Sequence, residues 1–218
     1  MVLSVESCDD PDGCGQWIGK LANLWRTCGD IQATFASVMG NVAENTKMAK
    51  FAGPTGGPLG GGHWNDADML QVGDIGLSIT EQRSHFALWC LMASPLLVGS
   101  DVSMLTNTSL GILGNVEVTA VNQDAMGAQG VPSSSQLEDP STASCWTKPM
   151  QDGSTAVILL NVGDAAASIS CKLSDLNIKA GAKNVRDLWL HKDLGPPKGG
   201  ALTAPSLASH DHMMFLVK

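Results

Sequence analysis

Charged residues are scarce in this chain of 218 residues, and most of them are acidic. Asp, Glu, Lys and Arg make up 16% of the sequence, the formal net charge is -8 at pH 7, and no stretch is rich in Lys or Arg. Nucleic acids and anionic membrane surfaces attract clustered positive charge. We therefore expect no nucleic acid and no membrane as a partner, and a neutral substrate fits the composition better.

Long apolar runs and metal-binding cysteine pairs are missing as well. No run reaches the roughly 18 residues that span a bilayer, and the chain does not open with the basic and apolar regions of a signal peptide. The six cysteines form no CxxC pair, which argues against a structural zinc site. Cys8 and Cys14 lie in a polar loop where a disulfide could form, and their spacing leaves that question open.

What the sequence does contain is a change of pattern near residue 130. Hydrophobic residues make up 44% of the chain, as in globular proteins. Up to residue 130, strand-like and helix-like segments alternate with short connections, which is typical of parallel α/β architecture. Beyond it, short β-rich runs are separated by Gly, Pro and Asp turns, which predicts an antiparallel β module. We therefore predict two domains, residues 1–130 and residues 131–218.

Within the first domain the pattern predicts individual elements. Apolar residues at helical spacing predict a helix over 16–26; they are Trp17, Leu21, Leu24 and Trp25. A helix over 78–94 begins with Ser78 and Glu81 at capping-box spacing and is apolar nearly all round, so it should be buried. The other predicted elements are strands at 1–6 and 95–101, and helices near 32–50 and from 102 onward; residues 29–31 could form a further short strand.

Three motifs could suggest a bound ligand, but each is better explained as structure. The glycine-rich loop at 53–62 lacks the Gly-Lys-Ser/Thr ending of a phosphate loop. The acidic run at 65–74 lacks the oxygen spacing of a calcium loop. His210 and His212 alternate on a predicted strand and could chelate a metal, although such residues more often decorate a surface. We expect no metal and no cofactor.

Acidic or polar residues occur at four places where the pattern indicates the carboxyl end of a strand. They are Glu6 after MVLSV, Asp30 after the predicted helix that carries Arg26, the pair Asp66 and Asp68 after HW, and the pair Ser100 and Asp101 after PLLVG. In parallel α/β folds, functional side chains lie at the carboxyl ends of strands. Glycoside hydrolysis requires two carboxylates, and an arginine beside the acid can hold substrate and set the proton affinity of the acid. Arg26 and Asp30, four residues apart, are therefore either part of such a site or a surface ion pair, and spacing alone does not decide.

Four segments in order along residues 1–130 resemble glycoside hydrolase family 27, the α-galactosidases and α-N-acetylgalactosaminidases, most closely the plant type. They are LANLWRTCGDI, GGHWNDADMLQVGDIGLS, RSHFALWCLMASPLLVGSDV and VTAVNQDAMGAQG, and weaker similarity continues through NVRDLW and SHDHMMFLV. The resemblance implies an α/β plus all-β fold class. It implies strands five to eight of a (β/α)8 TIM barrel, followed by an antiparallel β-sandwich domain.

The resemblance also implies roles for individual residues. The aspartate of the family's WRxxxD segment is the general acid/base, which falls on Asp30, and the arginine four residues earlier binds sugar hydroxyls, which falls on Arg26. The family's glutamate after strand five falls on Glu6 and contacts a sugar hydroxyl. The second aspartate of WNDPDM, which binds the sugar, falls on Asp68, with Met69 beside it as a further substrate-binding residue.

Departures from the family pattern bear on the sugar and on catalysis. Ala67 replaces the proline of WNDPDM, the glycine-rich loop is longer than the family's GPGGW, and CDDPDGC replaces an aromatic-rich segment after the glutamate. A relative acting on β-L-arabinopyranosides is therefore an alternative. The family's nucleophilic aspartate lies on strand four in a Lys-x-Asp motif, and no such tripeptide occurs in this sequence.

We therefore expect the C-terminal half of a retaining α-galactosidase-like enzyme that cleaves terminal α-linked galactose, inactive as the chain stands. The abrupt start in a strand suggests a longer protein cut at this point, with any targeting signal upstream; the resemblance implies a secreted, lysosomal or vacuolar protein. The expected partner is a galactose-containing carbohydrate, and a homodimer is left open. The rival interpretations are a non-catalytic carbohydrate-binding or degenerate protein, and an interaction protein without a sugar site.

Overall fold

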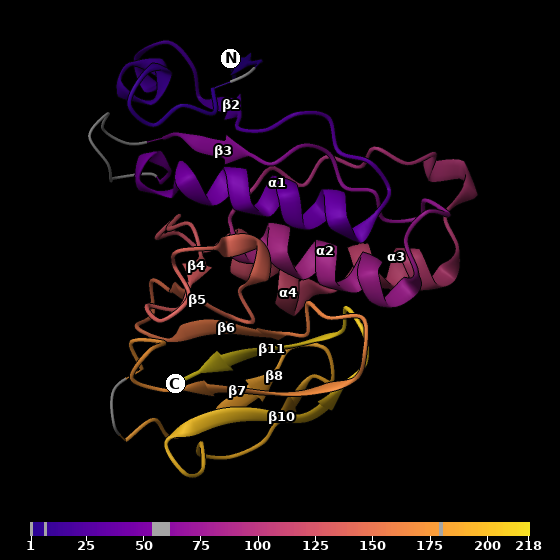
Figure 1. Cartoon of the computed structure of the whole chain (residues 1–218), viewed down its shortest axis with the longest axis vertical. Coiled ribbons are helices and arrows are strands. Elements are labelled where there is room, and N and C mark those ends of the chain that lie inside the picture. The colour runs from indigo at the N-terminus through magenta and orange to yellow at the C-terminus, as the bar shows by residue number, and fades with distance from the viewer. Residues whose placement is uncertain (1, 7, 54–61, 179–180) are drawn as a thin grey trace.

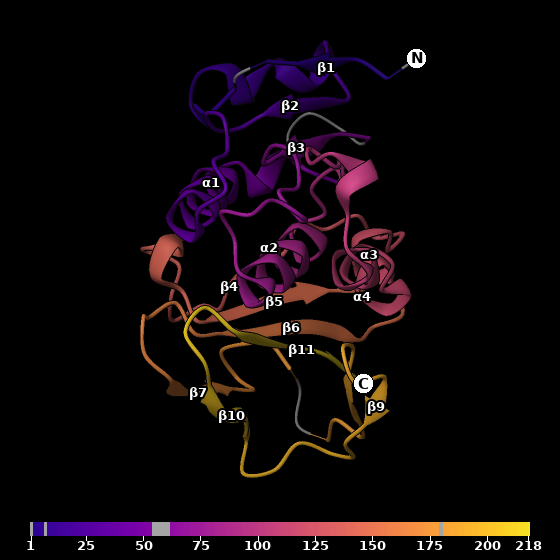
Figure 2. The same cartoon turned by 90° about the vertical axis from the view of Figure 1, so that its right-hand side faces the viewer.

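The computed structural model describes residues 2–6, 8–53, 62–178 and 181–218. Its elements form stacked layers, which Figure 1 and Figure 2 show from the N-terminal strands at the top to the C-terminal strands at the bottom. Short parallel strands come first, a layer of helices follows, and antiparallel sheets complete the stack. Residues 54–61 of the predicted glycine-rich loop lie outside the described residues.

The parallel strands are neighbours in sequence order and end at one edge. They are β1 (Ser4–Val5), β2 (Leu24–Arg26) and β3 (Trp64–Asp66). Arg26 pairs with Asp66, so the last residues of β2 and β3 lie side by side. The strand predicted at 1–6 is present but shorter, and the strand end that precedes Glu6 belongs to the same edge.

The helix predicted over 16–26 is wrong. Two short 3-10 turns, Cys14–Gln16 and Ile18–Lys20, precede β2, which takes up the last three residues of that range. Gly19 in the middle of the range disfavours an α-helix by about 1 kcal/mol relative to alanine. Pairing of β2 with strands on both sides satisfies its backbone groups and buries Trp25 completely. Non-local pairing therefore overrides a helical spacing that was fortuitous.

Two other predicted strands fail in whole or in part. Residues 29–31 form no strand, because the Ile31 amide donates to the Asp68 carboxylate instead of to a neighbouring strand. Within 95–101, the described backbone forms a single parallel bridge, from Val98 to Leu70. The chain there is aligned with the parallel strands, but it does not form a ladder.

Among the described residues, four α-helices lie between the parallel strands and the antiparallel sheets (Figure 1). They are α1 (Phe35–Lys47), α2 (Ile79–Leu91), α3 (Asn107–Leu113) and α4 (Val116–Asn122). The predicted capping box is confirmed, since Ser78 accepts from the Glu81 amide and Glu81 accepts from the Ser78 amide. Such a cap contributes about 1 kcal/mol to the stability of the helix. As predicted, α2 is buried, continuously so over residues 84–91.

The predicted antiparallel module is confirmed as a sandwich of two sheets. Its six-stranded sheet has the order β4-β5-β6-β11-β8-β9, and β10 pairs with β7 in the second sheet. The elements are β4 (Val131–Pro132), β5 (Cys145–Pro149), β6 (Thr155–Leu160), β7 (Ala167–Lys172), β8 (Val185–Asp187), β9 (Lys192–Asp193), β10 (Ala201–Leu207) and β11 (His212–Val217). The sequence pattern did not indicate β10, because Pro205 within it demotes a strand assignment.

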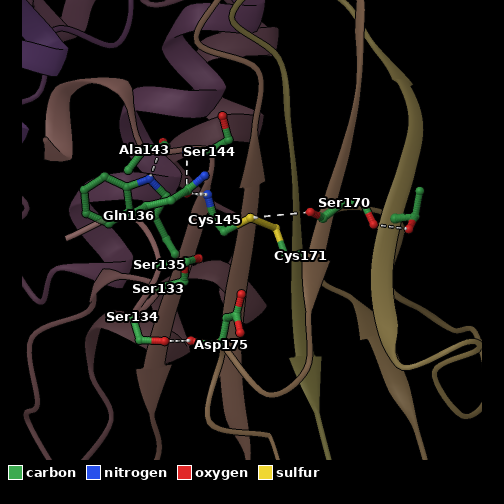
Figure 3. The surroundings of a disulfide bond; sticks show 12 residues. Ser133, Ser134, Ser135, Gln136, Ala143, Ser144, Cys145, Ser170, Cys171 and Asp175 are labelled. Carbon is green, nitrogen blue, oxygen red and sulfur yellow. Dashed lines mark hydrogen bonds between the residues drawn. A yellow bond between two sulfur atoms is a disulfide. The ribbon is translucent and has the colours of Figure 1, made fainter. Parts of the chain in front are cut away.

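Two disulfides tie the loops and sheets together. Cys145 on β5 bonds to Cys171 on β7 and so links the six-stranded sheet to the two-stranded sheet (Figure 3). For cysteines 26 residues apart, loop closure contributes about 3.5 kcal/mol in the chain-entropy model. Cys8 bonds to Cys14, which answers the question that their spacing left open.

The main hydrophobic core joins the helices to the six-stranded sheet. It contains Phe86 and Trp89 of α2 together with Trp146, Ile158 and Met214 of the sheet. A second core fills the space between the two sheets, and a third lies under the N-terminal loop. In the ranges that the structure describes, no helix combines the length and the apolar character needed to cross a membrane.

Candidate active site

Four charged side chains meet at the carboxyl ends of the parallel strands. Glu6 follows β1, Arg26 is the last residue of β2, Asp30 lies in the loop after β2, and Asp68 comes two residues after β3. Parallel strands bring such residues to one edge of a sheet, although the residues are far apart in sequence. The Arg26–Asp30 pair is therefore part of a larger cluster, and neither residue is on a helix.

Arg26 is the centre of this cluster. Its Nη2 lies 2.9 Å from Asp68 Oδ2 and 3.3 Å from Asp30 Oδ1, and its Nη1 lies 3.8 Å from Glu6 Oε1. Burial lowers the pKa of the guanidinium, but the surrounding groups, Asp68 foremost, raise that pKa above its ordinary value. Arg26 therefore remains a cation and holds three carboxylates around itself.

The three carboxylates differ in exposure. The Asp68 side chain is 6% exposed, whereas the Asp30 side chain is 85% exposed and the Glu6 side chain 79% exposed. The carboxylate of Asp68 also accepts hydrogen bonds from the amides of Ile31 and Met69, each at 2.7 Å. Asp68 is therefore a fixed acceptor. Asp30 and Glu6 face open space, where a ligand could donate a hydrogen bond to them or, if they are protonated, take a proton from them.

The remaining strand-end residues are distributed differently. Met69 follows Asp68 directly in the sequence and is 44% exposed. Asp101 accepts from the amide of Ser103 in its own turn, and the Ser100 hydroxyl donates to the Val72 carbonyl. Glu6, Arg26, Asp30 and Asp68 thus come together, with Met69 next to Asp68 in the sequence. The contacts described for Ser100 and Asp101 are with Val72 and Ser103 and not with the cluster.

Two residues at the site were not identified as functional from the sequence. The Asp66 carboxylate accepts from the Asp68 amide at 2.9 Å, and the Trp89 indole donates to the Asp68 carbonyl at 2.7 Å. Burial raises the pKa of the Asp66 carboxyl, against the lowering effects of the Asp68 amide and Arg26. The place of Asp66 at a strand end could have indicated a functional role. The apolar pattern of α2, in contrast, did not predict that the Trp89 indole donates to the Asp68 carbonyl.

His210 and His212, the potential metal ligands, are taken up by contacts between the two domains. His210 Nδ1 lies 2.7 Å from Glu81 Oε1 of α2, and the His210 ring stacks on Phe35 of α1. His212 lies between the Ser84 hydroxyl of α2, 2.9 Å from its Nδ1, and the Trp189 indole, 2.7 Å from its Nε2. Among the residues that the structure describes, no group of three or more His, Cys, Asp or Glu side chains is arranged to hold a metal ion.

A large cavity lies away from the charged cluster. It measures about 630 Å³. It is lined by Leu24 and Trp64, the first residues of β2 and β3, and by residues 122–125 at the C-terminal end of α4. The carboxylates lie at the opposite ends of the same strands. The cavity is therefore not the place where the polar groups converge, and the charged edge is the better candidate for chemistry.

Comparison with known proteins matches both parts of the chain. The family model described as "Alpha galactosidase A" matches residues 10–124, and the one described as "Alpha galactosidase C-terminal beta sandwich domain" matches residues 141–217. An α-galactosidase of Oryza sativa subsp. japonica is 37% identical over 202 residues, which is 92% of this chain and 45% of that protein. An α-galactosidase of Cyamopsis tetragonoloba is 40% identical over 80% of this chain and 40% of its own length. This chain thus spans less than half the length of either relative.

Solved structures agree with these matches over the whole chain. α-Galactosidase I of Mortierella vinacea superposes with a TM-score of 0.84 at 28% identity, covering 100% of this chain and 58% of that one. A family 27 β-L-arabinopyranosidase of Geobacillus stearothermophilus gives a TM-score of 0.82 at 27% identity, covering 100% of this chain and 49% of its own. The fold is the C-terminal half of a (β/α)8 barrel followed by an antiparallel β-sandwich.

Proposed function

Because this chain belongs to glycoside hydrolase family 27, the α-galactosidase family, we propose that it supplies the acid/base and some of the sugar-binding groups of a retaining α-galactosidase. The substrate would carry a terminal α-linked galactose. The observation that carries the proposal is the cluster at the carboxyl edge of the parallel strands, where Arg26 holds Glu6, Asp30 and Asp68.

Asp30 is the proposed general acid/base. Its carboxylate is exposed and is oriented by Arg26, so it can approach a ligand without losing its anchor. It would first protonate the departing glycosidic oxygen and then take a proton from the water that releases the sugar. The nucleophile would come from a segment other than these residues, because the family's Lys-x-Asp tripeptide does not occur in this sequence.

The other members of the cluster would bind the sugar. Asp68 presents a buried, fixed carboxylate, and Glu6 presents an exposed one on the neighbouring strand end. A hydroxyl that bonds to a charged group contributes about 1.5–3 kcal/mol. Arg26 donates to the same hydroxyls or to the carboxylates that hold them, and the exposed Met69 offers an apolar surface to a sugar face.

Domain organisation and location follow the same proposal. Residues 1–130 would form the barrel half and residues 131–218 the sandwich. A galactose-containing carbohydrate would be the partner. The cluster does not bear on the oligomeric state, and a homodimer is left open. Two disulfides favour an oxidising compartment, in keeping with a secreted, lysosomal or vacuolar protein.

One alternative substrate has specific support. A structural relative is a β-L-arabinopyranosidase, and β-L-arabinopyranose differs from α-D-galactopyranose by the absence of the exocyclic CH2OH group. The Cys8–Cys14 loop follows Glu6 in place of the aromatic-rich segment of the galactosidases, so the chain next to this proposed sugar-binding residue differs from theirs. A non-catalytic carbohydrate-binding protein is the further alternative.

The test is a hybrid in which residues 1–218 replace the matching segment of the rice α-galactosidase. We expect it to hydrolyse both p-nitrophenyl α-D-galactoside and raffinose, and Asp30→Asn should lower kcat on raffinose by about 10²–10⁴-fold. The matched control is Asp101→Asn, another exposed strand-end carboxylate, which should leave the rate unchanged. The isolated chain, compared in parallel, should show no turnover.

Three outcomes would change the conclusion. Faster hydrolysis of p-nitrophenyl β-L-arabinopyranoside than of the galactoside would favour the alternative substrate. A folded hybrid that cleaves neither compound would favour a non-catalytic protein. Full activity of Asp30→Asn on raffinose would remove Asp30 from the acid/base role.

A further inference from the structure

Asp68, the buried carboxylate of the site, has an unusual backbone conformation. Its φ angle is 81°, in the left-handed region that residues other than glycine rarely adopt. A residue in such a conformation persists only when its surroundings over-determine it, and such residues concentrate at functional sites. The contacts that hold the backbone of Asp68 therefore decide where its carboxylate points.

Both peptide groups around Asp68 are held by side chains. The Asp68 amide donates to Asp66 Oδ1 at 2.9 Å, and the Asp68 carbonyl accepts from Trp89 Nε1 at 2.7 Å. One residue earlier, the Ala67 amide donates to the Ser94 hydroxyl at 3.0 Å. Asp66 is the closest of these anchors in sequence and the one whose side chain faces the amide of the strained residue itself.

Asp66 is itself held in place by the parallel sheet. It pairs with Arg26 in the ladder between β2 and β3, and its carbonyl accepts from the Thr27 amide at 3.0 Å and the Thr27 hydroxyl at 3.2 Å. Asp66 is only 5% exposed, so its carboxylate lies within the protein rather than at the open edge. Its geometry suits a support for Asp68 better than direct contact with a ligand.

We propose that Asp66 is a positioning residue that fixes the left-handed turn at Asp68, and thereby aims the Asp68 carboxylate at Arg26 and at the Ile31 amide. Without the acceptor on Asp66, the Asp68 backbone can relax toward negative φ. The carboxylate then leaves the positions 2.9 Å from Arg26 Nη2 and 2.7 Å from the Ile31 amide. The link to sugar binding rests on the proposed function, whereas the link to the Asp68 backbone does not.

The isolated chain of 218 residues is sufficient for the first experiment. Asp66→Ala removes the acceptor, and Asp66→Asn keeps an oxygen that can accept the same hydrogen bond. Hydrogen exchange followed by NMR should show the Asp68 and Ile31 amides exchanging at least about tenfold faster in Asp66→Ala, and within about twofold of wild type in Asp66→Asn. Asp139→Ala is the matched control, because Asp139 accepts from the amide two residues on, Ser141, in an exposed turn elsewhere.

Two results would overturn the positioning role. One is unchanged exchange of the Asp68 and Ile31 amides in Asp66→Ala. The other is equal acceleration of every slowly exchanging core amide, because that indicates general destabilisation rather than local release. Failure of Asp66→Asn to restore slow exchange also counts against the hydrogen bond as the cause.

A double variant covers the case in which Asp66→Ala does not fold. Glycine adopts positive φ at little steric cost, so Asp68→Gly removes the strain that Asp66 is proposed to hold. We expect Asp66→Ala combined with Asp68→Gly to fold, and a much smaller effect of Asp66→Ala in that background than in wild type. If the double variant also fails to fold, Asp66 supports the sheet in another way and the proposal is wrong.

Titration of the same variants with D-galactose separates this inference from the proposed function. If wild type binds galactose, Asp66→Ala should raise Kd by about tenfold or more, as expected for a misplaced charged hydrogen-bond partner. Asp66→Asn and Asp139→Ala should bind as wild type does. Absence of binding by wild type would count against the proposed function, and the exchange rates would still decide whether Asp66 positions Asp68.

Discussion

His212 should make this protein less stable in acid, because its surroundings accept only the neutral imidazole. Trp189 Nε1 is a donor only, and it lies 2.7 Å from His212 Nε2, so that nitrogen must accept. The proton is then on Nδ1, 2.9 Å from the Ser84 hydroxyl, which in turn donates to the His210 carbonyl at 2.6 Å. A second proton on His212 would sit on Nε2, where this N–H and the Trp189 Nε1–H would both be donors facing each other.

The size of the effect follows from the pKa of the ring. Burial, assisted by the charge of Arg83, lowers the pKa of His212 from 6.5 to about 3. Between these values the unfolded chain binds more protons, so this contribution to stability is complete above pH 6.5 and is lost as the pH falls toward 3. At pH 4.5, about two pH units below the unfolded pKa of 6.5, the loss of stability is about 2.7 kcal/mol. Burial likewise lowers the pKa of His85 to about 3, which adds a loss of similar size.

Charged groups around His212 do not reverse this sign. Arg83 on α2 opposes protonation. Asp211 precedes His212 and accepts from the His212 amide, and Asp187 accepts from two amides of its own turn. The nearby His210 is directed at Glu81 and Asp164. No acidic group is recorded against either ring nitrogen of His212 within the described residues.

Urea unfolding at pH 7.0 and 4.5, followed by circular dichroism, measures the effect. His212→Gln retains an acceptor for Trp189 and a donor for Ser84 but does not titrate. It should therefore lose about 2.7 kcal/mol less stability than wild type between the two pH values. An identical pH difference in His212→Gln and wild type would refute the argument.

The remaining predictions concern a buried lysine, a disulfide and the acid/base. The Nζ of buried Lys148 donates to the Val121 carbonyl, and burial lowers the pKa of this lysine from 10.5 to about 8. Between pH 8 and pH 10.5 the unfolded chain binds more protons than the folded one, so the free energy of unfolding should rise with pH in that range. Lys148→Met should abolish this rise in chemical denaturation. Replacing Cys145 and Cys171 together by alanine should reduce the free energy of unfolding by about 3.5 kcal/mol, and a change under about 1 kcal/mol in urea melts would contradict the loop-entropy argument. In the hybrid enzyme, azide should partly restore the turnover of p-nitrophenyl α-D-galactoside by Asp30→Asn, whereas a complete lack of rescue would weaken the acid/base assignment.

The success of the sequence-based predictions depended on whether the causes were local. The capping box of Ser78 and Glu81 and the buried helix after it follow from spacing within one segment, and both were predicted correctly. The segment 16–26 has helical spacing too, but pairing with strands on either side determines its conformation. The missed disulfide between Cys145 and Cys171 joins two sheets whose pairing no short window of sequence contains.

The candidate site shows the same division. Strand ends and family motifs were enough to select Glu6, Arg26, Asp30 and Asp68, and the structure brings them together. Their roles in sugar binding and catalysis remain predictions. The sequence did not indicate which carboxylate is buried and which are exposed. Exposure depends on the strand pairing that places Arg26 beside Asp66 and on the loop whose Ile31 amide donates to the Asp68 carboxylate.

The sequence by itself determined the two-part architecture, the capped and buried helix α2, and the set of charged residues at the strand ends. These features depend on residue type and on short-range periodicity, which do not require contacts with distant segments of the chain. Only the tertiary structure decided the left-handed backbone of Asp68, the indole of Trp89 against its carbonyl, and the neutral state of His212. Each of these depends on groups brought together from distant segments within a buried environment, where one unmatched donor or acceptor costs about 1–3 kcal/mol.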